Sequence, residues 1–108
     1  MRKVLSNTQT QGTPFNDVPP NFAVAVILPT GQTMPDNVYL EYAVEVIDGT
    51  EVAVTDRVWK RRHPTPFTDD VGAGTSGNTF RLFNHTPGFI YRMVTDTAGI
   101  EAVIGTTL

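Results

Sequence analysis

Hydrophobic and polar residues alternate along much of the chain with the period of two that is typical of β-strands. The segment 22–28 is apolar on both faces, which predicts a strand covered on both sides. The segment 38–47 alternates most clearly and predicts a half-buried strand. Its inward face is predicted to carry Val38, Leu40, Tyr42, Val44 and Val46, and its outward face Tyr39, Glu41, Ala43 and Glu45.

A tight hairpin is predicted at Asp48-Gly49, because these residue types tolerate the backbone angles of a two-residue turn. The return strand is expected over 51–59, with a bulge where Asp56 interrupts its inward positions. Those inward positions are Val52, Val54 and Val58. Acidic residues gather in 36–56 and basic residues directly afterwards, so one interpretation is that the charges neutralise each other across the hairpin.

Three further strands are predicted in the last third of the chain, at 79–83, 89–95 and 100–106. Turn-forming residues separate them at 84–88 and 96–99. Because no segment reads as a helix, the sequence predicts an all-β fold. We expect an antiparallel β-sandwich or small barrel of about six to eight strands.

The first 21 residues are polar and contain several Pro and Gly residues, so neither helix nor strand periodicity is sustained. We interpret 1–21 as an extended N-terminal arm and 22–108 as the β-domain. The arm contains four residues that could be buried, namely Val4, Leu5, Phe15 and Val18. These favour an arm that docks onto protein, and the alternative is a disordered terminus.

A long loop is predicted at 64–78, because Pro and Gly are frequent there and loops of this length are uncommon unless functional or disordered. Three of its glycines, Gly72, Gly74 and Gly77, match the G-x-G-x-x-G pattern of dinucleotide sites. That site needs a helix after the glycines, and a strand is predicted here instead. The nucleotide interpretation is therefore set aside.

The composition narrows the possible functions. The chain has 108 residues and no cysteine, so it has one small core without disulfide or thiolate support, and oligomerisation or assembly is the expected supplement. A net charge of −3 argues against general nucleic-acid binding. The N-terminus lacks the apolar run of a secretory signal, and no apolar stretch is long enough to span a membrane.

The segment 59–63 is the sharpest local feature, since an aromatic residue precedes three cations and an imidazole. Its residues are Trp59, Lys60, Arg61, Arg62 and His63. Such a cluster could bind phosphate, an acidic protein surface or a polyanion. The alternative is a solvated strand end whose charges limit aggregation.

No motif predicts a catalytic, cofactor or metal site. Asp69 and Asp70 are adjacent and would point apart in an extended chain, and their spacing does not fit a calcium loop. His63 and His85 lie outside any zinc or nucleophile motif. A protein without an enzymatic role is therefore expected.

The C-terminal third, TFRLFNHTPGFIYRMVTDTAGIEAVIGTTL, resembles the last strands of an immunoglobulin-like or fibronectin III-like module. The cysteine-free all-β chain with its polar arm and Gly-rich loop also resembles small virion proteins of tailed bacteriophages. That resemblance implies a capsid decoration, head-tail or tail protein in repeated copies, located in virions assembled in the host cytoplasm.

Two functional hypotheses follow, and a third, a small β-barrel enzyme or cofactor binder, would require a pocket that the sequence does not reveal. The first is a virion structural protein that binds neighbouring subunits as a homo-oligomer or larger assembly. Its interface is predicted to contain Val4, Leu5, Phe15, Val18, Trp59, Lys60, Arg61, Arg62, His63 and Phe67. The second is a carbohydrate-binding or adhesion module that stacks sugars on Tyr39, Trp59 and Phe67.

Overall fold

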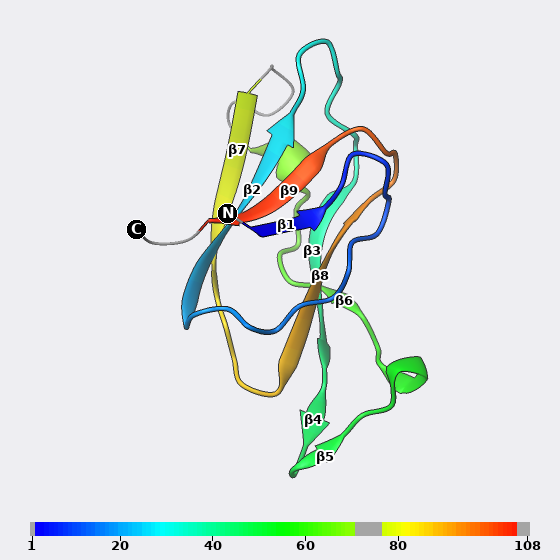
Figure 1. Ribbon diagram of the computed structural model, residues 1–108, viewed down its shortest axis with the longest axis vertical. Helices are drawn as coiled ribbons and strands as arrows, with labels where there is room; N and C mark the ends of the chain where they lie inside the picture. The colour runs from blue at the N-terminus through cyan, green and yellow to red at the C-terminus, as the bar shows by residue number, and fades with distance from the viewer. Residues whose placement is uncertain (1, 71–76, 106–108) are drawn as a thin grey trace.

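The computed structural model describes residues 2–70 and 77–105, which form β-strands and two short 3-10 turns (Figure 1). The strands are β1 (Arg2–Leu5), β2 (Asn21–Leu28), β3 (Val38–Val44), β4 (Val46–Ile47), β5 (Thr50–Glu51), β6 (Lys60–Arg61), β7 (Gly77–Asn84), β8 (Phe89–Thr95) and β9 (Glu101–Gly105). The 3-10 turns are η1 (Val54–Asp56) and η2 (Phe67–Asp69). In the described part of the chain, no helix is long and apolar enough to cross a membrane.

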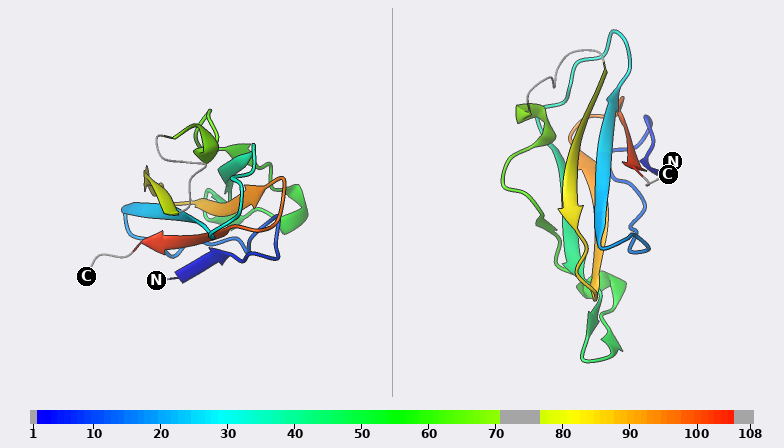
Figure 2. Two further views of the ribbon diagram at one scale, coloured as in Figure 1. Left: turned by 90° about the horizontal axis from the view of Figure 1, so that it is seen from above. Right: turned by 90° about the vertical axis from the view of Figure 1, so that its left-hand side faces the viewer.

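The strands form two antiparallel sheets that pack face to face, as the two views in Figure 2 show. One sheet has the strand order β1-β9-β2-β7 and the other has the order β6-β3-β8. The small β4–β5 hairpin projects from one end of the molecule (Figure 1). The predicted all-β fold is confirmed as a β-sandwich, and the strands predicted at 79–83 and 89–95 are present as β7 and β8.

Alternation explains how the central strands build the core. Along β2, every second side chain is buried and the intervening ones are half-exposed, so the expected cover on both faces is only partial. In β3, Val38 and Leu40 are buried as predicted, but Tyr39 on the opposite face is buried too. The core cluster also contains Met34, Phe67, Phe83, Tyr91, Met93, Ile100, Ala102 and Ile104.

The N-terminal segment is part of the sandwich, which corrects the prediction of an arm apart from the core. Strand β1 pairs with β9, and residues 10–15 then hydrogen-bond along the outer edge of β8. Val4, Leu5 and Phe15 are 5%, 0% and 2% exposed, because this segment closes the side of the sandwich between the two sheets. A Cβ at Gly12 would lie 1.8 Å from the Val4 carbonyl oxygen, so only glycine fits here.

The predicted turn at Asp48-Gly49 is confirmed, with φ angles of 49° and 75° that suit a type I′ hairpin. The prediction of a long return strand over 51–59 is wrong. Beyond Glu51 the chain leaves the sheet, forms η1 where the bulge was expected and returns only as the two-residue strand β6. Val54 and Val58, expected to face inward, are each 70% exposed because no second sheet covers this part of the chain.

Val46, also expected to face inward, is 40% exposed. The N–H groups of Glu45 and Val46 both donate to the Gly88 carbonyl oxygen, at 2.7 and 3.2 Å. One carbonyl receiving two consecutive amides breaks the regular pairing of β3 with β8. The hairpin therefore turns away from the sheet at this point.

Tyr91 fixes the corner where the chain crosses from β7 in one sheet to β8 in the other. Its buried hydroxyl accepts a hydrogen bond from the Thr86 backbone N–H at 3.1 Å and lies 3.2 Å from His85 Nδ1. Immunoglobulin-like sandwiches use a comparable tyrosine corner. The strand order differs from theirs, however, because the last strand there pairs beside the equivalent of β8, whereas β9 lies between β1 and β2.

Replacing Phe15 by alanine is expected to lower the free energy of unfolding by about 3–5 kcal/mol, because the ring is 2% exposed and packs on Phe22 and Tyr91. Urea unfolding followed by circular dichroism measures the change. Thr13→Ala, at an exposed position two residues away, is the control and should change stability by less than about 0.5 kcal/mol. Equal stability of the two variants would show that this segment is not part of the cooperative core.

Candidate functional site

The outer side of β7 carries the largest exposed apolar side chains of the two sheets. Phe80 and Leu82 are 64% and 76% exposed. The strand register sets Phe80 opposite Ala25 and Leu82 opposite Ala23, and directly paired residues point to the same face. The two alanines are small and half-exposed, so the phenyl and isobutyl groups stand above the sheet surface.

The backbone of β7 is also open on one side. Within the described residues β7 pairs with β2 only, so it forms an edge of the four-stranded sheet. The His85 N–H donates to the Pro20 carbonyl oxygen at 2.8 Å, and in antiparallel pairing the direction of the backbone groups alternates from one residue to the next. The N–H and C=O groups of Phe80 and Leu82 therefore point away from β2. We call this free side of the strand the β7 edge.

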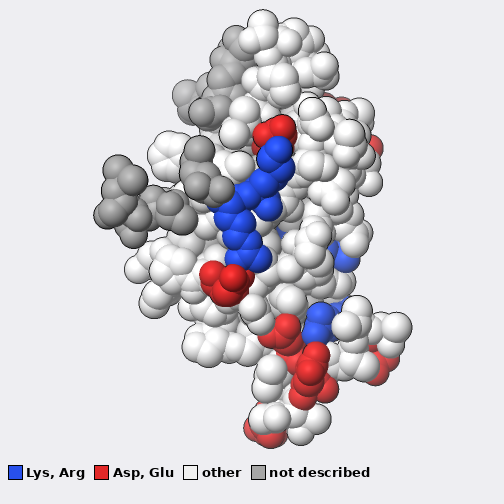
Figure 3. Space-filling view, in the orientation of Figure 1, with Lys and Arg blue, Asp and Glu red and all other residues white. Residues whose placement is uncertain are grey.

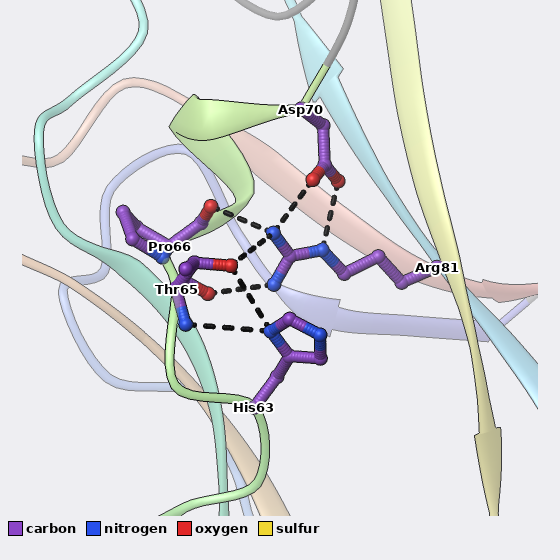
Figure 4. Close-up of polar contacts among 5 residues, drawn as sticks. All are labelled: His63, Thr65, Pro66, Asp70 and Arg81. Atoms are coloured by element: carbon purple, nitrogen blue, oxygen red, sulfur yellow. Dashed lines mark hydrogen bonds and ion pairs between the residues drawn. The ribbon is translucent and has the colours of Figure 1, made fainter.

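Arg81 points in the opposite direction and fastens the long loop to β7 (Figure 4). Its guanidinium donates to both carboxylate oxygens of Asp70, with Nε–Oδ2 at 2.8 Å and Nη2–Oδ1 at 2.6 Å. It also donates to the carbonyl oxygens of Thr65 and Pro66, at 2.7 and 2.8 Å. We refer to Thr65, Pro66, Asp70 and Arg81 as the Arg81 cluster.

The loop is held from a second direction by Phe67, which is fully buried. Its ring centroid lies 6.2 Å from that of Phe83, and the Arg81 guanidinium carbon lies 4.7 Å from the centre of the Phe67 ring. Residues 67–70 therefore lie against the inner side of β7, the side facing the other sheet. Seen from above in Figure 2, η2 lies on that side, and the β7 edge is left uncovered by it.

A cleft of about 740 Å³ lies between the end of β7 and this loop. Leu82, Phe83 and Asn84 contribute one wall, and Arg62 and His63 contribute another. The cleft is adjacent to the β7 edge, so it adds space beside a strand with free backbone groups. A side chain from a partner bound at the edge could enter it.

The remaining sheet edges are protected in the described part of the chain. At the β1 edge, Arg2 and Lys3 are exposed and pair with Asp17 and Glu101, and Figure 3 shows these charges as a band on the face that carries β1. The hydrogen bond from Arg2 lowers the pKa of the Asp17 carboxyl group. Residues 10–15 cover β8, and β6 has only two residues, both cationic.

The predicted cluster at 59–63 is divided between the second sheet and the loop that follows β6. The Arg61 guanidinium carbon lies 3.9 Å from the centre of the Tyr39 ring, whereas Trp59 has Arg92 over its ring at 4.1 Å. The His63 Nδ1 atom accepts from the Thr65 backbone N–H at 3.3 Å. Glu41 pairs with both Arg61 and Arg92, so Trp59, Arg61 and Arg92 lie close together on the second sheet, whereas His63 contacts the following loop.

Most of the other predicted interface residues lie inside the molecule. Val4, Leu5, Phe15 and Phe67 belong to the core, and Val18 packs partly buried against it. Burial of Phe67 and Tyr39 also removes two of the three aromatic residues proposed as sugar platforms, and Arg92 covers the ring of Trp59. The aromatic residues predicted to stack sugars are thus not an exposed platform.

Phe80 and Leu82 were not predicted to lie on the surface. In the segment 79–83, alternation places Thr79, Arg81 and Phe83 on one face and Phe80 and Leu82 on the other. Hydrophobicity alone would turn Phe80 and Leu82 inward. The available signal was Phe83, since it shares a face with Arg81 and can only be buried if the arginine also faces inward.

The ion pairs confirm part of the cross-hairpin interpretation of the charges. Arg57 lies 3.7 Å from Glu45 and 3.4 Å from Glu51, and Arg92 Nε lies 2.8 Å from Glu41 on the neighbouring strand. Part of the charge of the acidic and basic segments is therefore neutralised by ion pairs within the molecule.

Two titratable side chains near β7, those of Asp70 and His85, contact other residues of the protein. Asp70 is bound to Arg81, and His85 contacts Tyr91. Across residues 2–70 and 77–105, no group of three His, Asp or Glu side chains is placed to hold a metal ion. Gly72 and Gly74 lie outside the described residues, while Gly77 begins the strand β7, where a dinucleotide site would need a helix.

Comparisons with protein-family models, with curated proteins and with solved structures found no match to this chain. Function is therefore inferred from the residues and the geometry of the β7 edge.

Replacing Arg81 by alanine is expected to lower the free energy of unfolding by about 2–4 kcal/mol, because Asp70 and two carbonyl groups lose their donors. Asp70 is 27% exposed, so the cost should stay below that of a fully buried pair. Arg2→Ala, which breaks an exposed pair, is the control and should cost less than about 1 kcal/mol. Similar values in thermal and urea unfolding for both variants would contradict this role of Arg81.

Proposed function

We propose that this chain is a non-enzymatic assembly protein that binds other protein subunits by strand addition at the β7 edge. The observation that carries the proposal is the eight-residue strand β7, which among the described strands lies at a sheet edge with free backbone groups, beside the exposed apolar side chains of Phe80 and Leu82. An extended segment added to such an edge gains backbone hydrogen bonds, and alternate side chains find apolar contacts.

The protection of the other edges supports the choice of this one. Soluble β-proteins commonly shield their edges with charge, short strands or covering segments, because an open edge invites pairing with another chain. Charges shield β1, residues 10–15 cover β8, and β6 is short and cationic. An open β7 edge among protected ones suits a binding surface.

The setting that we propose for this binding is a virion of a tailed bacteriophage, to which the sequence resemblance points. In that setting the chain would be a capsid decoration, head-tail or tail protein present in repeated copies. Detection of the chain by mass spectrometry in purified particles, in stoichiometric amounts, tests the setting. A particle preparation without the chain would argue against it.

A fluorescein-labelled peptide of alternating Thr and Val residues provides a direct probe of strand addition. We expect its fluorescence anisotropy to rise on titration with the protein, and Leu82→Lys to weaken binding about fivefold, because losing the apolar cross-strand contact costs about 1 kcal/mol. Leu82 is 76% exposed, so the variant should remain folded.

Val58→Lys is the matched control, since Val58 is 70% exposed but lies away from β7. It should bind the probe as the unmodified protein does. A second probe with a central proline, which cannot complete the backbone pairing, should bind weakly to all forms. Binding that is absent, or equal in Leu82→Lys and Val58→Lys, would overturn strand addition at the β7 edge.

A further inference from the structure

The β7 edge has features that suit a second copy of itself, and this inference rests on the proposed function above. Its described outward side chains include Phe80 and Leu82, and the one charged residue of the strand, Arg81, faces inward. A twofold interface requires one patch to complement itself, so like charges must not meet. Between two β7 edges no exposed charge of the strand opposes its own copy.

The backbone geometry defines which residues would meet. Because the N–H and C=O groups of Phe80 and Leu82 point outward, these residues form the hydrogen-bonded pairs of an added antiparallel strand. A twofold axis at Arg81 sets Phe80 of each copy opposite Leu82 of the other. Aromatic–aliphatic pairs of this kind stabilise antiparallel sheets, and the two exposed side chains of each copy would be partly covered by those of the other.

Arg81 does not oppose this pairing. Although the axis brings the two arginines near each other, each arginine side chain is only 11% exposed, and its guanidinium is already bound to the Asp70 carboxylate of its own chain. The β1 and β6 edges differ in this respect, since an antiparallel twofold pairing there would set exposed Lys and Arg residues against each other.

We infer that β7 pairs antiparallel with β7 of a second copy, with Phe80 opposite Leu82 across the axis, so that two four-stranded sheets become one continuous sheet. The resulting dimer presents the two copies with their β4–β5 hairpins exposed. It would serve as the unit from which larger assemblies are built.

Sedimentation velocity of the full chain tests the inference. The 11.8 kDa monomer should give way to a species of twice that mass as concentration rises. Phe80→Lys and Leu82→Lys should each raise the dimer dissociation constant at least about tenfold, whereas Val58→Lys should leave it unchanged. A chain that is monomeric at every concentration, or variants that dimerise equally, would overturn the inference.

Cysteine cross-linking tests the register, because the natural chain has no cysteine. Mixing Phe80→Cys with Leu82→Cys chains should give a disulfide-linked heterodimer, since directly paired strand residues approach within disulfide range. Each chain alone should cross-link much less, and Val58→Cys mixed with Leu82→Cys is the control. Predominant links between two copies of Leu82→Cys would overturn the proposed register.

The two proposals fail in different ways. If the Thr-Val probe binds at the β7 edge but the full chain stays monomeric, strand addition stands and the second copy is excluded as the partner. If neither the probe nor a second copy binds, both proposals fall.

Discussion

The inward direction of the Arg81 side chain determines which side chains of β7 lie on the molecular surface. Strand residues alternate between two faces, so fixing one side chain fixes all its neighbours on the strand. Because the guanidinium is bound by Asp70 and two loop carbonyl groups, Phe80 and Leu82 must face outward. A partly buried ion pair thus leaves an aromatic and an aliphatic side chain in solvent, the reverse of the usual distribution.

The same interaction of Arg81 also holds the loop after β6 against the small core. Residues 62–70, which follow β6, form only the short turn η2, and their ordering costs conformational entropy. Burial of Phe67 and the bonds from Arg81 to Thr65, Pro66 and Asp70 offset that cost within residues 65–70. The loop therefore extends the layer of the shorter sheet, and the core is closed where that sheet has no further strand.

Sequence reasoning succeeded where local pattern dominates. Strands β2, β3 and β8 follow from alternation, and the β4–β5 turn follows from Asp48-Gly49. It failed where distant partners decide. The N-terminal segment looked detachable because its pairing with β8 and β9 has no local signature, and Val54 looked buried because nothing in 51–59 reveals that no sheet covers it.

The site was the least predictable part for the same reason. Phe67 was taken for a surface aromatic because it lies in a polar loop, and only its contact with Phe83 from a distant strand shows otherwise. Phe80 and Leu82 were assigned to a strand but not to its outer face, since that choice depends on a carboxylate eleven positions away from Arg81. Edge position itself is a property of the assembled sheet.

The pairing of β1 with β9 has a consequence for synthesis. Arg2 lies opposite Ile104, so β1 leaves the ribosome long before its partner strand β9 has been made. Until then the nascent chain exposes the free edge of β2 and the apolar side chains that β9 will cover. Contacts of such long sequence separation slow folding, so this chain is expected to depend on chaperones during translation more than a helical protein of equal length.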